Sequence, residues 1–330
     1  LKRTHGGARR MSQVAGRAYA DLAEALIRGL HRATTNAFEA QNGVVRGWDA
    51  AVIAMGKLGG HEMTAASDID LIVVYGGPDD VRQSSGARPL APSQYYARLT
   101  QRLIAALSAP TSEGGLYQVD MRLRPSGQKG PVATGFASFE SYQQNDAWTW
   151  EHMALTRARV VSGPPELTEA LADVIHRVLT SPRDRAKTAR DVRDMRQRVW
   201  EEKGGETWHL KQARGGLVDL EFLVQFLQLI HAAEHPDVLS QNTETSLRAL
   251  NAAGLLGPHG PDLIAACRLF HDLTQVLRLC FDGVFTPEKS SAGLRQFLAD
   301  VAGEADFARL ELRIVEVQQT VADAFEDLVR

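Results

Sequence analysis

The chain has 330 residues, with 37 Lys and Arg residues against 40 Asp and Glu residues and a formal net charge of −3. This near balance supplies no overall basic field, which argues against a nucleic-acid-binding protein that works through bulk charge. The hydrophobic fraction of 44% and the charged fraction of 23% fit a folded globular chain and exclude a disordered one. The length is sufficient for two domains.

Two cysteines, Cys267 and Cys280, are too few for a disulfide framework or a four-thiolate zinc site. We expect both thiols to stay reduced. No apolar run of the sequence reaches the length of a membrane span, and the N-terminal segment lacks the apolar core of a signal peptide, so a cytoplasmic location is expected. The chain starts with Leu1 rather than methionine, from which we expect a piece of a longer polypeptide.

The first 135 residues are predicted to mix strands with helices. Apolar residues at every fourth position predict an amphipathic helix over about 11–40, and a similar stripe predicts another over 95–107. Continuous apolar runs and, in the last case, period-two alternation predict strands at 49–55, 67–75 and 116–124.

From Phe136 to the C-terminus the pattern is almost wholly helical, with Gly and Pro at the breaks. The predicted helices lie near 136–145, 148–160, 165–179, 183–203, 215–233, 243–254, 261–282, 290–302 and 304–329. The sequence therefore predicts a small unit that contains a sheet, followed by a large helical unit.

Two carboxylates lie two residues apart in the second predicted strand, Asp68 and Asp70. Side chains alternate along a strand, so both project from one face. Asp120 lies between Val119 and Met121 in the third predicted strand and joins the pair if the two strands are neighbours. Carboxylates so close repel one another unless a cation lies between them, and three of them can hold two divalent ions. Asp68 alone also fits a turn residue, but buried carboxylates without a role are uncommon.

A glycine-rich turn, residues 56–60, precedes these carboxylates. Gly56, Gly59 and Gly60 permit positive φ and close approach of the backbone, so that N–H groups can point at a phosphate, and Lys57 adds a positive charge. The turn is not a Walker A loop, because Leu58 rather than Ser or Thr follows the lysine.

A Gly-Gly turn, an Asp-x-Asp strand and a third acidic strand residue resemble the nucleotidyltransferase superfamily that includes DNA polymerase β. Longer segments between residues 50 and 232 are similar, in order and spacing, to the glutamine synthetase adenylyltransferase family: GKLGGHEMTAASDIDLIVVY, YQVDMRLRPSGQKGPV, SYQQNDAWTWEHMALTRARVVSG and KQARGGLVDLEFLVQFLQL. The resemblance implies an α+β nucleotidyltransferase domain with a small mixed sheet, followed by a large α-helical bundle. The implied parts are a tail and helix that pack on the catalytic domain, the catalytic domain and the bundle, at 1–45, 46–163 and 164–330.

The reaction that the resemblance implies is transfer of AMP from ATP to a tyrosine hydroxyl of glutamine synthetase, with release of pyrophosphate. Asp68 and Asp70 would hold both Mg²⁺ ions, and Asp120 would bind the ion that activates the nucleophile and help to take the tyrosine proton. The implied nucleotide contacts are Gly59, Gly60, Ser67, Lys57, Arg122, Arg124, Lys211 and Asp219. The two arginines also fit pairing with nearby acids, and the last two residues also fit plain helix-start chemistry.

The family's full-length enzyme has two similar halves, one that adds AMP to glutamine synthetase and one that removes it. RPSG at 124–127 and DAWTWEH at 146–152 resemble the adenylylating half. The adenylyl-removing half, which phosphorolyses adenylyl-tyrosine, is the first alternative, and a uridylyltransferase that acts on a PII-type protein is a weaker one. An alternative of another class is a catalytically silent module that docks glutamine synthetase or a PII regulator, against which the intact set of three carboxylates argues.

The resemblance also implies partners and a role. The expected partners are glutamine synthetase, as the protein substrate, and a PII-type signalling protein, in the regulation of nitrogen assimilation. Neither a nucleic acid nor a membrane is expected.

Overall fold

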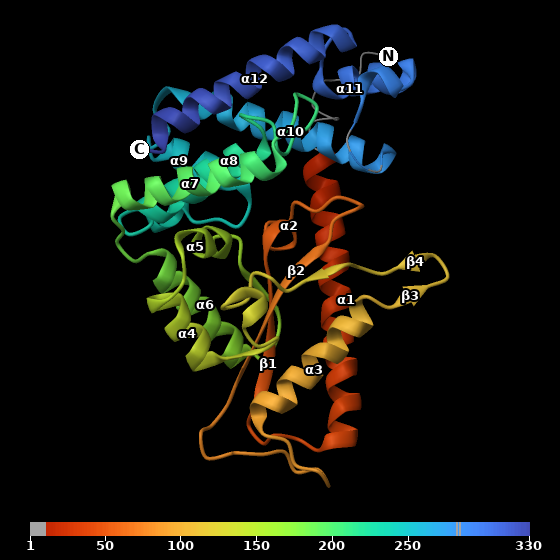
Figure 1. Ribbon diagram of the computed structural model, residues 1–330, viewed down its shortest axis with the longest axis vertical. Helices are drawn as coiled ribbons and strands as arrows, with labels where there is room; N and C mark the ends of the chain where they lie inside the picture. The colour runs from red at the N-terminus through yellow and green to blue at the C-terminus, as the bar shows by residue number, and fades with distance from the viewer. Residues whose placement is uncertain (1–10, 282, 284) are drawn as a thin grey trace. The chain divides into compact units, whose positions relative to one another are not determined.

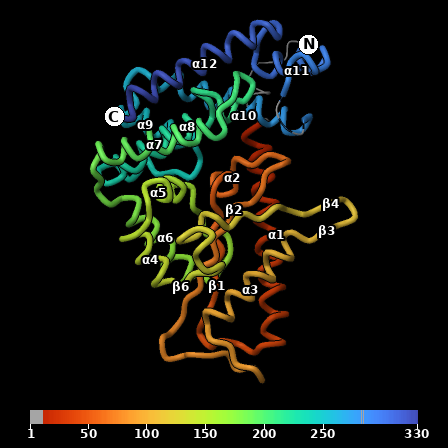
Figure 2. The backbone as a smooth tube through the Cα atoms, in the orientation of Figure 1, coloured from red at the N-terminus to blue at the C-terminus, as the bar shows by residue number. Residues whose placement is uncertain are grey.

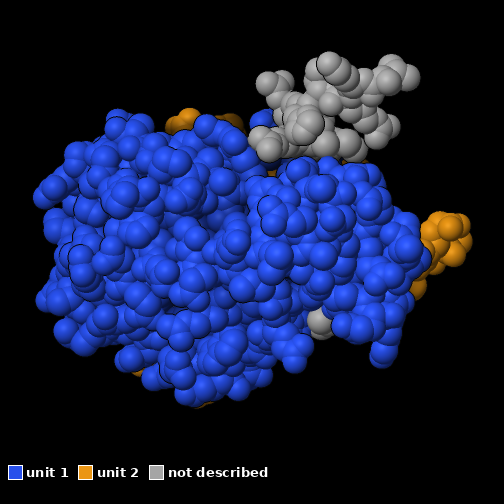
Figure 3. All heavy atoms as spheres, turned by 90° about the horizontal axis from the view of Figure 1, so that it is seen from above, with its two compact units in different colours: residues 1–19, 62–66, 180–330 blue, residues 20–61, 67–179 orange. Residues whose placement is uncertain are grey.

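The computed structural model describes residues 11–281, 283 and 285–330, so the predicted tail at 1–10 lies outside the described residues. The chain divides into two compact units, which Figure 3 colours separately. The sheet unit contains Ala20–His61 and Ser67–Leu179. Among the described residues, the helical unit contains Met11–Tyr19, Glu62–Ala66 and those of Thr180–Arg330. The three-part domain division made from the sequence stays a prediction.

A mixed five-stranded sheet forms the centre of the sheet unit. Strand β1 (Asp49–Ala54) pairs antiparallel with β2 (Ile69–Gly76) on one side and with β7 (Arg159–Ser162) on the other. Strands β5 (Val119–Asp120) and β6 (Thr134–Gly135) both pair in parallel with β2. Figure 1 shows β1 and β2 side by side, as their register requires. The small mixed sheet agrees with the prediction.

The strands β1 and β2 form because their sequences are nearly continuous apolar runs, which suit strands that are covered on both faces. Ala51, Val52 and Ile53 have no exposed surface. Helix α3 packs on β2 through Tyr96, whose ring stacks on Tyr75 with 4.8 Å between ring centroids.

The remaining elements of the sheet unit are short or peripheral, apart from the long helix α1. Its helices are α1 (Met11–Asn42, of which the first nine residues belong to the helical unit), α2 (Gly56–Gly59), α3 (Pro92–Leu107), α4 (Phe136–Asn145), α5 (Thr149–Leu155) and α6 (Pro165–Leu179). A small hairpin, β3 (Pro110–Thr111) with β4 (Gly114–Gly115), and a 3₁₀ turn at Gly127–Lys129 complete it.

The helical unit follows the predicted order of helices closely. They are α7 (Arg185–Lys203), α8 (Leu217–His231), α9 (Thr243–Ala252), α10 (Gly260–Cys280), α11 (Ala292–Ala302) and α12 (Phe307–Leu328), with 3₁₀ turns at Pro236–Val238, Gly257–His259 and Pro287–Lys289. Helix α8 is buried on most of its surface, including Leu220, Phe226 and Leu227, and so forms the centre of this unit. In the part of the chain that the structure describes, no helix is both long and apolar enough to cross a membrane.

Two predicted elements differ from the structure. The strand predicted at 116–124 is ladder-paired only at Val119–Asp120, after which the chain turns through Ser126 and Gly127, both with positive φ. The helix predicted at 148–160 ends at Leu155, and the chain continues into β7. The β-branched residues of β7, Val160 and Val161, are only two, and two residues cannot be distinguished from the helical pattern around them.

Candidate functional site

The carboxylates of Asp68, Asp70 and Asp120 lie together where β2 and β5 begin to pair. Asp70 and Asp120 are register partners in the parallel ladder, and Asp68 immediately precedes Ile69, the first residue of β2. The Ile69 N–H donates to the carbonyl oxygen of Gln118 at 2.9 Å and so fixes this alignment. One oxygen from each carboxylate lies within 4.8 Å of the others. The structure therefore brings together the three acidic residues singled out in the sequence.

Arg122 lies beside this carboxylate cluster. Its backbone N–H donates to Oδ1 of Asp120 at 2.8 Å, and its Nε donates to Oδ2 at 2.7 Å. The hydrogen bond from the Arg122 side chain holds the pKa of Asp120 below its ordinary value. In turn, the hydrogen bond and charge of Asp120, and then the charges of Asp70 and Asp68, raise the pKa of Arg122. The guanidinium therefore lies in the field of all three carboxylates.

Arg124 has a different environment from Arg122. Its guanidinium donates to the carbonyl oxygens of Met121 at 2.7 Å and of Gly130 at 3.3 Å. Arg124 thus closes the loop that follows β5, and this contact holds the turn in place next to Asp120. Its predicted contact with a nucleotide phosphate stays a prediction.

The glycine-rich turn forms α2, a single helical turn between β1 and β2. Gly56 has φ +53, and a Cβ at this position would overlap a carboxylate oxygen of Asp70. A Cβ on Gly59 would overlap the carbonyl oxygen of Arg157. These two positions therefore require glycine for close approach of the backbone.

The N–H groups of this turn are used differently from the expectation. The Gly59 N–H donates to the Met55 carbonyl at 2.9 Å, and the Gly60 N–H donates to the Gly56 carbonyl at 3.1 Å. These two donors bond within the turn, and the predicted contacts of Gly59 and Gly60 with the triphosphate stay a prediction. Lys57, in the turn, and Ser67, directly before Asp68, are both half-buried and stay predicted nucleotide contacts.

The sequence did not predict a set of contacts that holds the glycine-rich turn, made by Arg159 and Glu24 and here called the brace. Arg159, on β7, donates to the carbonyl oxygens of Gly59 and Leu58, each at 3.3 Å, and forms an ion pair with the buried Glu24 of α1. Glu24 also pairs with Arg28, four residues along the same helix. The spacing of Glu24 and Arg28 was the only signal of this brace in the sequence.

A second group of ligand-type side chains, Asp21, Glu24 and His61, also has ligand atoms within 4.8 Å of one another. It fits a metal ion poorly, because Glu24 is buried and two guanidiniums, of Arg28 and Arg159, engage its two oxygens. By contrast, the guanidinium on Asp120, that of Arg122, is exposed and can swing away. Hard divalent ions prefer several carboxylate oxygens with room for water. The set of Asp68, Asp70 and Asp120 meets that requirement better.

The two site candidates of the helical unit lie at the start of α8. Asp219 is buried, forms an ion pair with Arg196 of α7 and accepts a hydrogen bond from the Gly215 N–H. Lys211 is exposed, and its carbonyl oxygen accepts from the Val218 N–H at 3.0 Å. Both residues thus make hydrogen bonds at the start of α8, as the alternative interpretation expected. Their contact with a nucleotide stays a prediction.

Comparison with known proteins places the chain in a family. Residues 5–174 match the family model of glutamate-ammonia ligase adenylyltransferase, and residues 185–280 match that of GlnD PII-uridylyltransferase. The chain is 49% identical over 318 residues to the bifunctional glutamine synthetase adenylyltransferase/adenylyl-removing enzyme of Xanthobacter autotrophicus. It is 47% identical over 320 residues to the enzyme of the same name from Bradyrhizobium diazoefficiens.

These alignments cover 96% of this chain but 32% of each relative, so the chain spans about a third of the length of the curated relatives it matches. The first family model includes β1, β2 and β5, and hence all three carboxylates and the glycine-rich turn. Since that model also covers more than half of the residues, the chain belongs to the glutamate-ammonia ligase adenylyltransferase family.

Proposed function

We propose that this chain transfers AMP from ATP to a tyrosine hydroxyl of glutamine synthetase and releases pyrophosphate. The observation that carries the proposal is the convergence of Asp68, Asp70 and Asp120 on neighbouring strands of a chain that belongs to this family. In this proposal the sheet unit is a nucleotidyltransferase fold of the polymerase β type. Cys267 and Cys280 are free, which supports a reducing, cytoplasmic setting.

The three carboxylates fit two Mg²⁺ ions, because they offer hard oxygen ligands from two adjacent strands within 4.8 Å of one another. When bound, such ions supply charge stabilisation at the phosphoryl oxygens and ease deprotonation of the attacking oxygen. Asp68 and Asp70 would hold both ions, and Asp120 would hold one and orient the tyrosine hydroxyl. The lowered pKa of Asp120 keeps it ionised, which suits a ligand better than a strong proton acceptor.

The segments RPSG and DAWTWEH support the direction of the reaction, because they resemble the adenylylating half of the family's enzyme. The curated relatives are named for both adenylyl transfer and adenylyl removal, and this chain corresponds to about a third of each. The match of residues 185–280 to a PII-uridylyltransferase model supports a PII-type protein as a regulator that acts on the helical unit.

The experiment that tests the direction uses this chain with unmodified glutamine synthetase, Mg²⁺ and ATP labelled in the α-phosphate. We expect label to enter the tyrosine of the target and pyrophosphate to appear in equal amount. A parallel reaction contains adenylylated glutamine synthetase and inorganic phosphate. Removal of AMP there, together with no transfer in the first reaction, would assign the chain to the opposite half.

The Asp70→Asn substitution tests the metal site. It removes one charge from the carboxylate cluster without changing the shape of the side chain, so we expect AMP transfer to fall by at least about a hundredfold. The Tm should stay close to that of the unchanged protein. Asp80→Asn, in the exposed loop after β2, is the matched control and should leave transfer unaffected. Equal activity of the two variants would contradict the assignment.

A further inference from the structure

The loop after β5, residues 121–130, touches the candidate site directly and belongs to the same sheet unit. Arg122, in this loop, donates its backbone N–H to Oδ1 of Asp120 at 2.8 Å. A backbone donor cannot swing away as the guanidinium can, so this bond orients the carboxylate for as long as the loop keeps its shape. The shape of the loop therefore decides how one of the three carboxylates points.

Hydrogen bonds among its own residues close this loop. The guanidinium and the backbone N–H of Arg124 both donate to the carbonyl oxygen of Met121, at 2.7 Å and 3.3 Å. The Gly127 N–H donates to the Arg124 carbonyl at 2.8 Å. Between them Ser126 has φ +61, a left-handed conformation that residues with a side chain adopt rarely. Such a conformation persists where the surroundings hold it.

Tyr142 of α4 holds Ser126 from outside the loop. Its phenol oxygen accepts hydrogen bonds from the backbone N–H and from the hydroxyl of Ser126. The phenol donates its own proton to the carboxylate of Glu151 on α5, with Oε1 at 2.9 Å, and thus uses its one donor and both acceptor positions. Glu151 is buried and also accepts from the Trp148 N–H at 2.9 Å, which fixes its carboxylate. All four residues belong to the sheet unit.

Helix α4 is itself attached to the sheet. Figure 2 traces the chain from β6, which pairs with β2, directly into α4. Phe139, one turn before Tyr142, has no exposed surface. Nε2 of His152 on α5 lies 2.8 Å from the carbonyl oxygen of Gln143, so α5 joins α4 at a second place. Since β2 also contains Asp70, the helix that holds the loop is fixed to the strand of the other carboxylates.

We propose that Tyr142 is a positioning residue, which holds the loop 121–130 in the shape that orients Asp120 for metal binding. The path runs from the phenol to Ser126, through the hydrogen bonds of the loop, and from the Arg122 N–H to the carboxylate. Without the phenol hydroxyl, Ser126 loses the acceptor of its N–H and can leave the left-handed conformation. This inference rests on the proposed function only through the metal site.

The test measures binding of Mn²⁺, as a spectroscopic probe for Mg²⁺, by electron paramagnetic resonance, so that it does not depend on turnover. Tyr142→Phe removes the hydroxyl alone and should weaken Mn²⁺ binding about fivefold, which is the effect of one hydrogen bond on an equilibrium. In the same variant the N–H groups of Lys129 and Gly130, which bond within the loop, should exchange with deuterium faster. Those of β1 and β2 should keep their exchange rates.

Tyr95→Phe is the matched control. It removes another tyrosine hydroxyl of the sheet unit, one that donates to the carbonyl oxygen of Gly43 at 3.0 Å, and it should leave Mn²⁺ binding unchanged. A purely structural role for Tyr142 predicts that both variants lower the Tm and bind Mn²⁺ as tightly as the unchanged protein. That result would overturn the inference.

Glu151 gives a second test, which also serves if Tyr142→Phe does not fold. Glu151→Ala removes the acceptor that fixes the Tyr142 hydroxyl and should weaken Mn²⁺ binding in the same direction. Glu151→Gln retains an acceptor oxygen and should restore most of the affinity. Unchanged Mn²⁺ binding in a folded Glu151→Ala variant would speak against the role of this contact.

The two proposals can fail separately. Loss of Mn²⁺ binding in Asp70→Asn, with normal binding in the folded Tyr142→Phe and Glu151→Ala variants, contradicts the positioning role alone. Normal binding in Asp70→Asn contradicts the metal site itself, and the positioning role with it.

Discussion

In our proposal, the guanidinium of Arg122 competes with the metal ions for the Asp120 carboxylate. It engages both oxygens of that carboxylate, and the charges of Asp68 and Asp70 also favour its protonated form. A metal ion that binds Asp120 must share or displace this guanidinium. The displaced group then lies close to the triphosphate, where an arginine can bind phosphate oxygens.

Substitution of Arg122 by Gln should therefore strengthen metal binding while it weakens use of ATP. Removing the positive charge that is paired with Asp120 removes its competition with the cation, so we expect the Kd for Mn²⁺ to fall severalfold. The KM for ATP should rise in the same variant. Titration with Mn²⁺ and steady-state kinetics measure the two effects, with Arg177→Gln, which breaks an exposed pair with Glu140, as the control. Weaker Mn²⁺ binding in Arg122→Gln would contradict the competition.

At the scale of single residues, the sequence predicted that the acidic residues lie together, but it did not predict the contacts of the basic residues. Strand alternation placed Asp68 and Asp70 together, and the apolar neighbours of Asp120 indicated a strand. The contacts of Arg124 with carbonyl oxygens, and the ion pair of Arg159 with Glu24, depend on loop shape and on a distant helix. Local periodicity contains no information about either.

Among the elements, β7 and α1 are joined by a buried imidazole. Nδ1 of His31 lies 2.8 Å from the hydroxyl oxygen of Ser162, at the end of β7. Burial lowers the pKa of His31 from its ordinary value of 6.5. The unfolded chain therefore binds a proton at this residue before the folded chain does, and the folded state loses stability as the pH falls below about 6.5.

The His31→Gln substitution should flatten this pH dependence. At pH 7.5 we expect it to lower the free energy of unfolding by about 1 kcal/mol, the value of one hydrogen bond. Between pH 6.5 and 5 the unchanged protein should lose stability more steeply than the variant. Urea unfolding at several pH values measures both slopes, and His176→Gln, on the exposed side of α6, is the control. Parallel slopes for His31→Gln and the unchanged protein would contradict the argument.

Two strands of the sheet that the sequence missed, β6 and β7, depend on partners. Strand β7 has four residues and β6 has two, so their pattern is too short to show a period. Each exists because β1 or β2 offers an edge with unpaired backbone groups. The long helices α6, α7 and α12 could be predicted, since their apolar stripes repeat over several turns.

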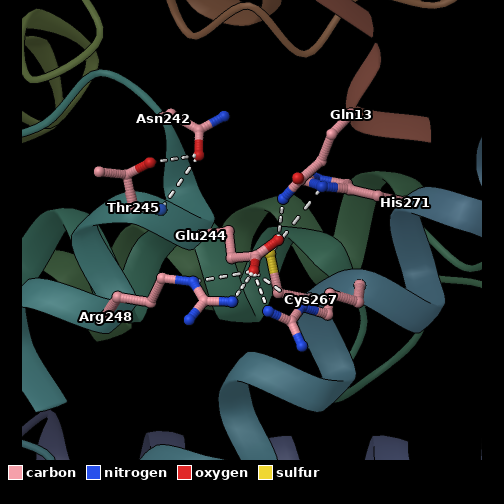
Figure 4. Close-up of polar contacts among 8 residues, drawn as sticks. Gln13, Asn242, Glu244, Thr245, Arg248, Cys267 and His271 are labelled. Carbon is pink, nitrogen blue, oxygen red and sulfur yellow. Dashed lines mark hydrogen bonds and ion pairs between the residues drawn. The ribbon is translucent and has the colours of Figure 1, made fainter. Parts of the chain in front are cut away.

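At the scale of the whole molecule, α1 is one continuous helix whose residues are divided between the two units. Met11–Tyr19 belong to the helical unit, and the helix continues to Asn42 in the sheet unit. The contact of Gln13 with the buried Glu244, drawn in Figure 4, fixes its first turn within the helical unit. Since helix formation is cooperative along a chain, order at one end of α1 supports order at the other.

This arrangement predicts that the protein unfolds in one calorimetric transition, and that Glu244→Ala separates it into two. The substitution removes a buried carboxylate that accepts from Arg248 and Arg268, whose guanidiniums are largely exposed, and should lower the stability of the helical unit by about 1–2 kcal/mol. Glu326→Ala breaks an exposed pair with Arg214 and should cost less than about 1 kcal/mol, without a change in the number of transitions. Differential scanning calorimetry of the three proteins distinguishes these outcomes. A single transition in Glu244→Ala, shifted no further than in Glu326→Ala, would show that Glu244 does not couple α1 to the helical unit.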